Sequence, residues 1–278
     1  MAQRILVTGS TGQLGGAILA ALSGGIHSAE GSSRTGSAGT RLIDFDLPST
    51  VKFDGVDTLV LVSAGEAEDD VVIARHETAI AAAERDGVSH VIYSSLTASG
   101  DHLGFALAHR WTEHRLQRST LNWTILRNGL YAELFGALLT WSNDRLDSAF
   151  GGGALAAVAR LDLADAAAVV AAAPAQHAGR IYELVGPPIT ATDVAQALDV
   201  NVDAVALESR RSELMGAGLK PFQPDMQMSI YSSVRHGVMG STSPDLQMLL
   251  GRPLRDAVTI AASVAAATRP ASRGEARP

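Results

Sequence analysis

Apolar and polar residues alternate in blocks along the first 130 positions of the chain, and the blocks predict strands and helices in turn. Short runs rich in Val, Ile and Leu predict strands at 5–7, 41–43, 58–62, 90–93 and 123–126, with a weaker strand at 27–33. Apolar residues at helical spacing predict helices at 14–22, 69–85 and 106–119. This order predicts an α/β fold, a Rossmann-type doubly wound parallel sheet with helices on both faces.

The regular alternation of predicted strands and helices ends after about residue 130. The pattern there predicts a helix at 131–141, a flexible glycine break at 151–153, an Ala-rich helix at 163–173, a strand at 180–185 and mostly helical structure beyond. We therefore expect a Rossmann domain at 1–130 and a smaller, mostly helical lobe at 131–268 whose chain returns in part to the first sheet. Residues 269–278, which contain two prolines and a glycine, are expected to form a disordered tail.

Composition narrows the classes of function. The 278 residues are 46% hydrophobic and 18% charged, which is typical of a globular protein, and the net charge of −7 argues against a broad surface for DNA or RNA. The absence of cysteine excludes disulfides and thiolate chemistry, and the histidines lack metal-ligand spacing, so we expect no metal site. No apolar stretch approaches the roughly 20 residues of a membrane span, and no export signal is present, so we expect a cytoplasmic protein without a membrane partner.

The first chemical signal is the run Gly9-Ser10-Thr11-Gly12-Gln13-Leu14-Gly15, which follows the first predicted strand and opens the first predicted helix. Gly9 permits a tight turn, Gly12 allows a pyrophosphate to approach the backbone, and Gly15 lets the helix pack close to the sheet. The free N–H groups and the positive dipole end of the helix would hold the phosphates. The spacing is G-x-x-G-x-x-G rather than the commoner G-x-G-x-x-G, but the strand–loop–helix context still predicts a dinucleotide site.

The end of the second predicted strand indicates which dinucleotide is bound. Sites that prefer NAD place an acid there for the ribose 2′-hydroxyl, whereas NADP sites place an arginine nearby. Here Arg34 follows Ser32 and Ser33 without an acid, and its planar guanidinium suits a 2′-phosphate. The alternative interpretation of Arg34 is a solvated surface side chain. Asp44 and Phe45, after the third strand, lie where an adenine edge would be held.

With these motifs in place, the chain resembles the NmrA-like group of atypical short-chain dehydrogenase/reductases, and within it the branch of NADPH-dependent quinone reductases and triphenylmethane-dye reductases. The resemblance begins at T-G-S-T-G-Q-L-G-G and extends over most of the chain. Its further segments are 76–83, Tyr93-Ser94-Ser95-Leu96, Leu126-Arg127-Asn128-Gly129-Leu130-Tyr131, Arg160-Leu161-Asp162, Tyr182-Glu183-Leu184 and Leu249-Leu250-Gly251-Arg252-Pro253. The glycine loop is shared widely, whereas the L-R-N-G-x-Y stretch is fairly specific to this branch.

The resemblance implies NADP(H) as cofactor and assigns roles at matching positions. Gly9 to Leu14 would hold the pyrophosphate, Arg34 the 2′-phosphate, and Ser63, Ala64 and Gly65 would line the ribose and adenine. Asn128, Gly129, Leu130, Tyr131, Ala132 and Glu133 would lie along the nicotinamide and substrate side, and Arg160 would approach the cofactor from the second lobe. Two departures from the family are a polar, glycine-containing second strand and a short segment at 147–159.

One family feature is missing. Short-chain dehydrogenases that act on alcohols and ketones use Tyr-x-x-x-Lys as a proton-transfer pair, but Phe105 and His109 occupy that spacing here. Alcohol–ketone chemistry is therefore disfavoured, whereas a quinone tolerates the loss because hydride addition gives an aromatic hydroquinone. Water, His109 or Tyr131 could supply the proton, although both side chains also suit purely structural roles. The candidate catalytic residues are Asn128, Tyr131 and His109.

Two functions remain open from the sequence. The first is an NADPH-dependent oxidoreductase that transfers hydride to quinones or related conjugated, dye-like acceptors. The alternative is a non-catalytic NADP(H)-binding redox sensor or regulator of the NmrA type. The absence of the tyrosine and lysine fits both functions, and the small and aromatic residues between Asn128 and Phe135 favour a substrate site. We expect a monomer or a homodimer.

Overall fold

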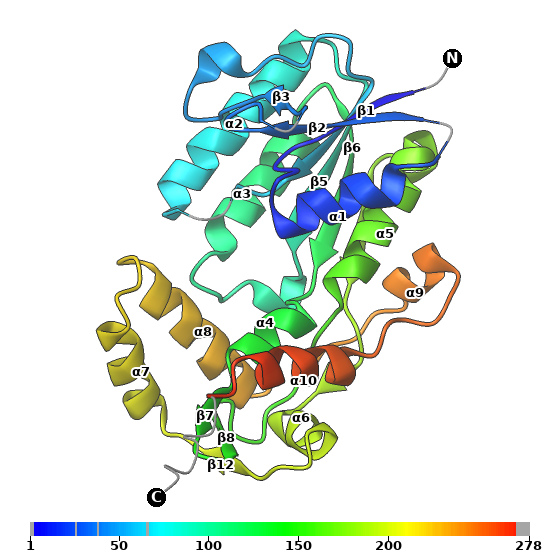
Figure 1. The fold of residues 1–278 in the computed structure, drawn as a ribbon. Helices are drawn as coiled ribbons and strands as arrows, with labels where there is room; N and C mark the ends of the chain where they lie inside the picture. Colours follow the sequence, from blue (N-terminus) through cyan, green and yellow to red (C-terminus); the bar gives the residue numbers. More distant parts are fainter. Residues whose placement is uncertain (1–2, 26, 38, 65–66, 271–278) are drawn as a thin grey trace, which may run out of the picture. The chain divides into compact units, whose positions relative to one another are not determined.

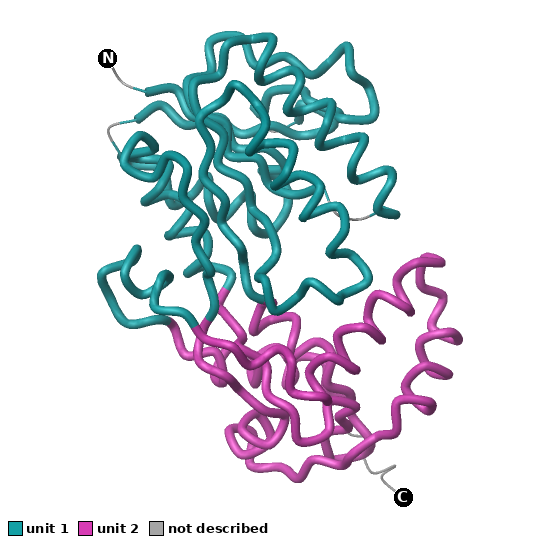
Figure 2. Tube along the Cα trace, turned by 180° about the vertical axis from the view of Figure 1, so that it is seen from behind, with its two compact units in different colours: residues 1–129, 160–185, 243–254 teal, residues 130–159, 186–242, 255–278 magenta. Residues whose placement is uncertain are grey.

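The protein is described by a computed structural model that covers residues 3–25, 27–37, 39–64 and 67–270 (Figure 1). The chain forms two compact units: unit 1 comprises residues 1–129, 160–185 and 243–254, and unit 2 comprises residues 130–159, 186–242 and 255–278 (Figure 2). The predicted cofactor residue Gly65 and positions 271–278 of the predicted tail lie outside the described residues.

Unit 1 is built on a parallel sheet of seven strands, as the pattern of the sequence predicts. The strands are β1 (Arg4–Val7), β2 (Ser28–Ser33), β3 (Arg41–Leu42), β4 (Thr58–Val62), β5 (His90–Leu96), β6 (Asn122–Asn128) and β10 (Arg180–Leu184). Their order is β10-β6-β5-β4-β1-β2-β3, and all six pairings are parallel. The chain moves outward in opposite directions from β1 and β4, so the switch point of this Rossmann-type sheet lies between these two strands.

Helices pack in pairs against this sheet (Figure 1). The helices of unit 1 are α1 (Gln13–Leu22), α2 (Asp69–Arg85), α3 (Ala106–Gln117), α5 (Arg160–Ala172) and α9 (Asp245–Leu250), with short 3-10 turns at η1 (Pro48–Thr50), η2 (Ala98–Gly100) and η3 (Pro174–His177). Helix α1 packs beside α5, and α2 beside α3. Because crossovers between parallel strands are right-handed, reversing direction at β1 and β4 puts the two pairs on opposite faces of the sheet.

The core of unit 1 follows the predicted apolar positions. The buried residues of α1 are Leu14, Gly15, Ile18 and Leu22, and the spacing of the three apolar side chains is the helical spacing that predicts this helix. On α2 the buried face includes Val72, His76, Ala79, Ile80 and Ala83. Ala79, Ile80 and Ala83 join a cluster with Leu59, Leu61, Val91 and Tyr93 from β4 and β5. Burying these strands on both faces explains their continuous apolar runs.

Unit 2 contains short strands and helices. They are α4 (Ala132–Ala137), β7 (Thr140–Ser142), β8 (Arg145–Ser148), β9 (Leu155–Ala156), β11 (Pro188–Ile189), α6 (Ala191–Ala197), β12 (Val202–Ala204), α7 (Leu207–Gly216), α8 (Gln223–Arg235) and α10 (Ala257–Ala267). Strands β12, β8 and β7 form one small sheet, and β11 pairs with β9. Thr190 closes the N-terminus of α6 with a capping box that includes Asp193.

Two local predictions for unit 2 are wrong. The predicted helix at 131–141 ends at Ala137, because residues 140–142 pair with β8 as strand β7 and the Trp141 indole donates to the Ala265 carbonyl at 2.8 Å. The predicted flexible break at 151–153 is a packed turn. A Cβ atom at Gly153 would lie 1.8 Å from the Val234 carbonyl oxygen, so only glycine permits this close approach.

The described part of the chain shows neither a membrane-spanning helix nor a cluster of metal-binding side chains. No helix there combines the length and the apolar character needed to cross a membrane. The same residues contain no group of three or more His, Asp or Glu side chains that could hold a metal ion.

Candidate functional site

The glycine loop lies at the carboxyl end of β1, beside the switch point of the sheet. Gly9 adopts a left-handed conformation with φ of +60°, and its carbonyl accepts a hydrogen bond from the Gly12 N–H at 2.9 Å. A Cβ atom at Gly15 would lie 2.4 Å from the Gly9 oxygen, so this glycine is required for helix α1 to begin so close to the loop. Gly12 is the N-cap of α1 and brings no capping side chain, which leaves the helix terminus suited to an anion.

Ser10 anchors this loop to β2. Its N–H and its hydroxyl both donate to the Ser32 carbonyl, at 3.0 and 3.1 Å. A Cβ atom at residue 31 would lie 2.2 Å from the Ser10 hydroxyl oxygen, so Gly31 makes room for this anchor. The polar, glycine-containing second strand, which departs from the family pattern, therefore has a local structural reason.

The remaining loop residues divide by exposure. Thr11, Gly12 and Gln13 are exposed, and Ser10 is half-buried, whereas Leu14 and Gly15 are buried beneath the first turn of α1. The exposed backbone of this loop can therefore be reached by a ligand, while Leu14 and Gly15 fix the position of the helix.

The loops after β2 and β3 carry three charged residues, Arg34, Asp44 and Asp46, and helix α2 adds Arg75. Arg34 is exposed and donates no hydrogen bond to any described residue, and Asp44 and Phe45 are half-buried, Phe45 being packed against the core of unit 1. Asp46 receives two hydrogen bonds from Arg75 of α2, at 2.7 and 2.6 Å. The sequence analysis assigned no role to Asp46 or Arg75, since 29 positions separate them and neither belongs to a recognisable motif.

The loop after β4 is held by a buried histidine. His76 Nε2 accepts a hydrogen bond from the Ala64 N–H at 3.1 Å, so Nε2 carries no proton and Nδ1 donates to the Thr112 hydroxyl at 2.8 Å. The Ser63 N–H donates to the Ser94 hydroxyl at 3.0 Å. Burial lowers the pKa of His76 to about 3, which keeps the ring neutral and preserves this arrangement.

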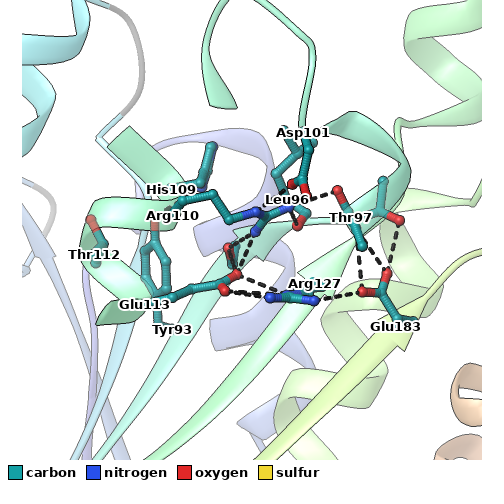
Figure 3. Close-up of polar contacts among 12 residues, drawn as sticks. Tyr93, Leu96, Thr97, Asp101, His109, Arg110, Thr112, Glu113, Arg127 and Glu183 are labelled. Carbon is teal, nitrogen blue, oxygen red and sulfur yellow. Dashed lines mark hydrogen bonds and ion pairs between the residues drawn. The ribbon is translucent and has the colours of Figure 1, made fainter. Parts of the chain in front are cut away.

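Tyr93 and His109 form a second buried pair next to His76. The Tyr93 hydroxyl and His109 Nδ1 lie 2.9 Å apart, and Figure 3 labels both side chains. The Tyr93 ring also contacts His76 edge-on. Burial raises the pKa of Tyr93, and burial together with the Arg110 charge lowers the pKa of His109 to about 4. His109 is therefore a neutral, half-buried ring near pH 7 and is tied to a tyrosine that the sequence analysis did not single out.

An ion-pair network fixes the carboxyl ends of β5, β6 and β10 (Figure 3). Glu113 of α3 is 2% exposed and accepts hydrogen bonds from Arg110, from Arg127 at 2.7 Å and from the Ser95 hydroxyl at 2.6 Å. Arg127 also reaches Glu183, 3.2 Å away, whose other carboxylate oxygen accepts from the Thr97 hydroxyl at 2.8 Å. The hydrogen bonds and charges of the neighbouring carboxylates raise the pKa of Arg127, so this guanidinium keeps its positive charge.

Asn128 is the last residue of β6, directly after Arg127 of the ion-pair network. Its backbone carbonyl accepts from the Thr97 N–H at 2.9 Å, and its side chain is 7% exposed. The side-chain oxygen Oδ1 is buried and has no hydrogen-bond partner among the described residues. Since an unpaired buried acceptor costs about 1–3 kcal/mol, this atom is suited to a donor supplied by a ligand, such as a carboxamide N–H.

The other predicted site residues fall in different parts of the chain. Gly129 belongs to unit 1 and donates to the Leu184 carbonyl at 2.8 Å. Leu130, Tyr131, Ala132 and Glu133 belong to unit 2, where Tyr131 is the N-cap of α4 and Ala132 donates to the Val158 carbonyl. Arg160 opens α5 and lies in unit 1, not in the second lobe as expected, because α5 packs beside α1 on the sheet.

No protein-family model matches the chain. It is 32% identical over 225 residues to quinone oxidoreductase 2 of Escherichia coli strain K12, and the alignment covers 77% of each chain. Among solved structures, triphenylmethane reductase of Citrobacter sp. in complex with NADP(H) superposes with a TM-score of 0.83 at 26% identity over 95% of this chain and 99% of the other. The NADPH-dependent quinone oxidoreductase of E. coli in complex with NADPH gives a TM-score of 0.80 at 27% identity over 95% and 100%.

Proposed function

Because this chain belongs to the NmrA-like group of atypical short-chain dehydrogenase/reductases, we propose that it is an NADPH-dependent reductase that transfers hydride to quinones or related conjugated acceptors. The family and the NADP(H)-bound neighbours support NADP(H) as the cofactor and an NAD(P)H reductase as the class of enzyme. We choose a quinone as the acceptor because the relatives are a quinone oxidoreductase and a triphenylmethane reductase, and because the residues at the candidate site suit this chemistry.

The observation that carries this proposal is the buried Oδ1 of Asn128, which has no hydrogen-bond partner in the part of the chain that the structure describes. It lies at the same carboxyl edge of the sheet as the exposed glycine loop, and ligands of doubly wound folds bind outside this edge at the switch point. The glycine loop, Arg34, Ser63, Ala64 and Asn128 all belong to unit 1, so we assign cofactor binding to this unit. We assign selection of the acceptor to the part of residues 131–268 that belongs to unit 2.

Each residue has a limited task in the proposed reaction. The backbone of residues 9–14 holds the pyrophosphate, Arg34 holds the 2′-phosphate, and Asn128 Oδ1 orients the nicotinamide carboxamide. NADPH, when bound, supplies the hydride. The quinone accepts this hydride, which carries two electrons, and then takes up one proton to become the hydroquinone.

Water is the source of the proton in this proposal. Phe105 cannot donate a proton, and His109 is neutral with a low pKa and shares its Nδ1 with Tyr93. Tyr131, a half-buried N-cap in unit 2, orients the acceptor rather than protonating it. Positioning supplies most of the rate enhancement, because a quinone becomes aromatic on reduction and needs little acid assistance.

The test is NADPH oxidation, followed by absorbance, with a panel of acceptors. Small benzoquinones and naphthoquinones should be turned over, whereas secondary alcohols with NADP and unconjugated ketones with NADPH should react little. Tight NADPH binding with no turnover of any acceptor would contradict the enzyme and favour the alternative, a redox sensor of the NmrA type.

A further inference from the structure

Two loops at the carboxyl edge of the sheet are tied together by one arginine. Asp46 follows β3, and Ala64 follows β4. Arg75, in the second turn of α2, donates from Nε and Nη2 to the two carboxylate oxygens of Asp46 and from Nη1 to the Ala64 carbonyl at 3.4 Å. The Arg75 side chain is 19% exposed and that of Asp46 is 45% exposed, so the carboxylate remains open to solvent on one side.

The pair lies near Arg34, because Arg34 directly follows Ser33, which pairs with Leu42 at the end of β3 and accepts a hydrogen bond from the Ile43 N–H at 2.9 Å. The hydrogen bonds from Arg75 lower the pKa of Asp46, and the charges of Arg75 and Arg34 lower it further. The charge of Asp44 in turn acts on Arg75. Arg34, Asp44, Asp46 and Arg75 therefore form one charge cluster, which we call the adenosine-side cluster, with two cations and two carboxylates.

An ionised Asp46 without a partner would oppose NADPH binding at Arg34. It would repel the 2′-phosphate and would compete with it for the Arg34 guanidinium. Arg75 occupies both oxygens of Asp46 and cancels its charge, so that neither effect operates.

We propose that Arg75 determines cofactor specificity by neutralising Asp46, which leaves Arg34 available for the 2′-phosphate. This inference rests on the proposed NADPH-dependent function. In this proposal Arg75 acts through its hydrogen bonds to Asp46 and not through a contact with the cofactor, so it is a positioning residue. Removing its charge should convert an NADP-type site into one that discriminates poorly between the two cofactors.

A double-mutant cycle on the full chain tests this mechanism. Dissociation constants for NADPH and NADH are measured by calorimetry for the wild type, Arg75→Gln, Asp46→Asn and the double variant. Arg75→Gln should weaken NADPH binding roughly tenfold, equivalent to about 1.4 kcal/mol, and should change NADH binding by less than about twofold. Asp46→Asn alone should leave NADPH binding unchanged or slightly tighter, and in the double variant it should restore NADPH binding to within about threefold of wild type.

Salt and a matched variant separate charge from structure. Raising ionic strength screens exposed charges, so the NADPH defect of Arg75→Gln, taken relative to wild type, should shrink as salt is added. Arg41→Gln breaks the Arg41–Glu30 ion pair of β2 and β3, whose side chains are 29% and 47% exposed. This control should not alter the ratio of NADPH to NADH affinity.

Three results would overturn the proposal. Equal losses for both cofactors in Arg75→Gln would mean that the ion pair only supports the two loops. A double variant as weak for NADPH as Arg75→Gln would mean that Arg75 does not act through Asp46. A wild-type protein that binds no NADPH would refute the proposed function itself. This outcome is recognised first, because wild-type binding is measured before any variant is made.

Discussion

The glycine loop after β1 and the Asn128 end of β6 serve the same proposed cofactor but are built in opposite ways. The loop is one contiguous run of seven residues, largely exposed, and its chemistry comes from backbone N–H groups at the start of α1. The Asn128 end is buried and depends on side chains from β5, β6, α3 and β10, with Glu113 at the centre of the network. We therefore expect the glycine loop to be sensitive to a single substitution that changes its backbone. We expect the Asn128 end of β6 to be sensitive to substitutions that destabilise the ion-pair network around Glu113.

The largest effect is expected at the loop. Gly12→Val places a branched side chain at the helix terminus where the phosphates approach, which should weaken NADPH binding about a hundredfold or more through the loss of several charge-assisted hydrogen bonds. Gly12 has an ordinary φ of −83°, and its Cβ would lie 3.2 Å from the Gly9 oxygen, so the fold should survive with a small local shift.

Calorimetry on folded protein measures this change, and a thermal melt shows that the variant is folded. Gly152→Val is the matched control, because a Cβ atom there meets nothing within 4 Å. Wild-type NADPH affinity in a folded Gly12→Val protein would place the phosphate site elsewhere.

The next effect concerns the support of the second region. Glu113→Ala removes the carboxylate that Arg110 and Arg127 share and leaves both cations without this buried partner, which should cost about 3–5 kcal/mol of unfolding free energy. Urea unfolding measures this loss. Glu77→Ala, which removes a 43% exposed partner of Arg115, should cost no more than about 1 kcal/mol. Similar losses in the two variants would show that the network is not a special support.

Arg34 tests the cofactor preference of the first region. Arg34→Ala should weaken NADPH binding about tenfold or more, in line with about 1.5–3 kcal/mol for a charge-assisted hydrogen bond, and should leave NADH binding nearly unchanged. Calorimetry with both cofactors gives the ratio. Arg118→Ala removes another exposed arginine, at the C-cap of α3, and serves as control. Equal losses for NADPH and NADH would remove Arg34 from the 2′-phosphate site.

Asn128 separates function from stability in the second region. Asn128→Ala should lower kcat/KM for quinones about tenfold, because one neutral hydrogen bond of about 1 kcal/mol would be lost together with some positioning of the nicotinamide. Since Oδ1 has no hydrogen-bond partner among the described residues, the unfolding free energy should stay the same or rise slightly. Tyr131→Ala should also reduce turnover. A large loss of stability in Asn128→Ala would assign the residue a structural role.

His109 should show the smallest effect. His109→Ala should lower the quinone rate by less than about tenfold, below the roughly 10²–10⁴-fold typical of a general acid. With a pKa of about 4, His109 is neutral across the range where an ordinary histidine titrates, so the wild-type rate should show no step near pH 6.5. A thousandfold loss, or a step near pH 6.5 that disappears in His109→Ala, would make His109 the proton donor.

The sequence by itself determined the sheet, its helices and the glycine loop. Apolar runs of five or so residues and helical spacing at Leu14, Ile18 and Leu22 are local signals, and they set the elements whatever lies next to them. The same holds for Gly9, Gly12 and Gly15, because the backbone atoms that require glycine at these positions belong to the same loop. In unit 2 these local signals failed at 140–142, where pairing with β8 overrode a pattern that predicts helix.

Only the tertiary structure decided which charges meet. Asp46 and Arg75, or Glu113 and Arg127, are polar residues with no distinctive spacing, and each pair comes from separate elements that the parallel sheet brings to one edge. The unpartnered Oδ1 of Asn128 and the bond between Tyr93 and His109 depend likewise on what surrounds each side chain. Hydrogen bonds and ion pairs act over a few ångströms in space, whereas the sequence reports only neighbours along the chain.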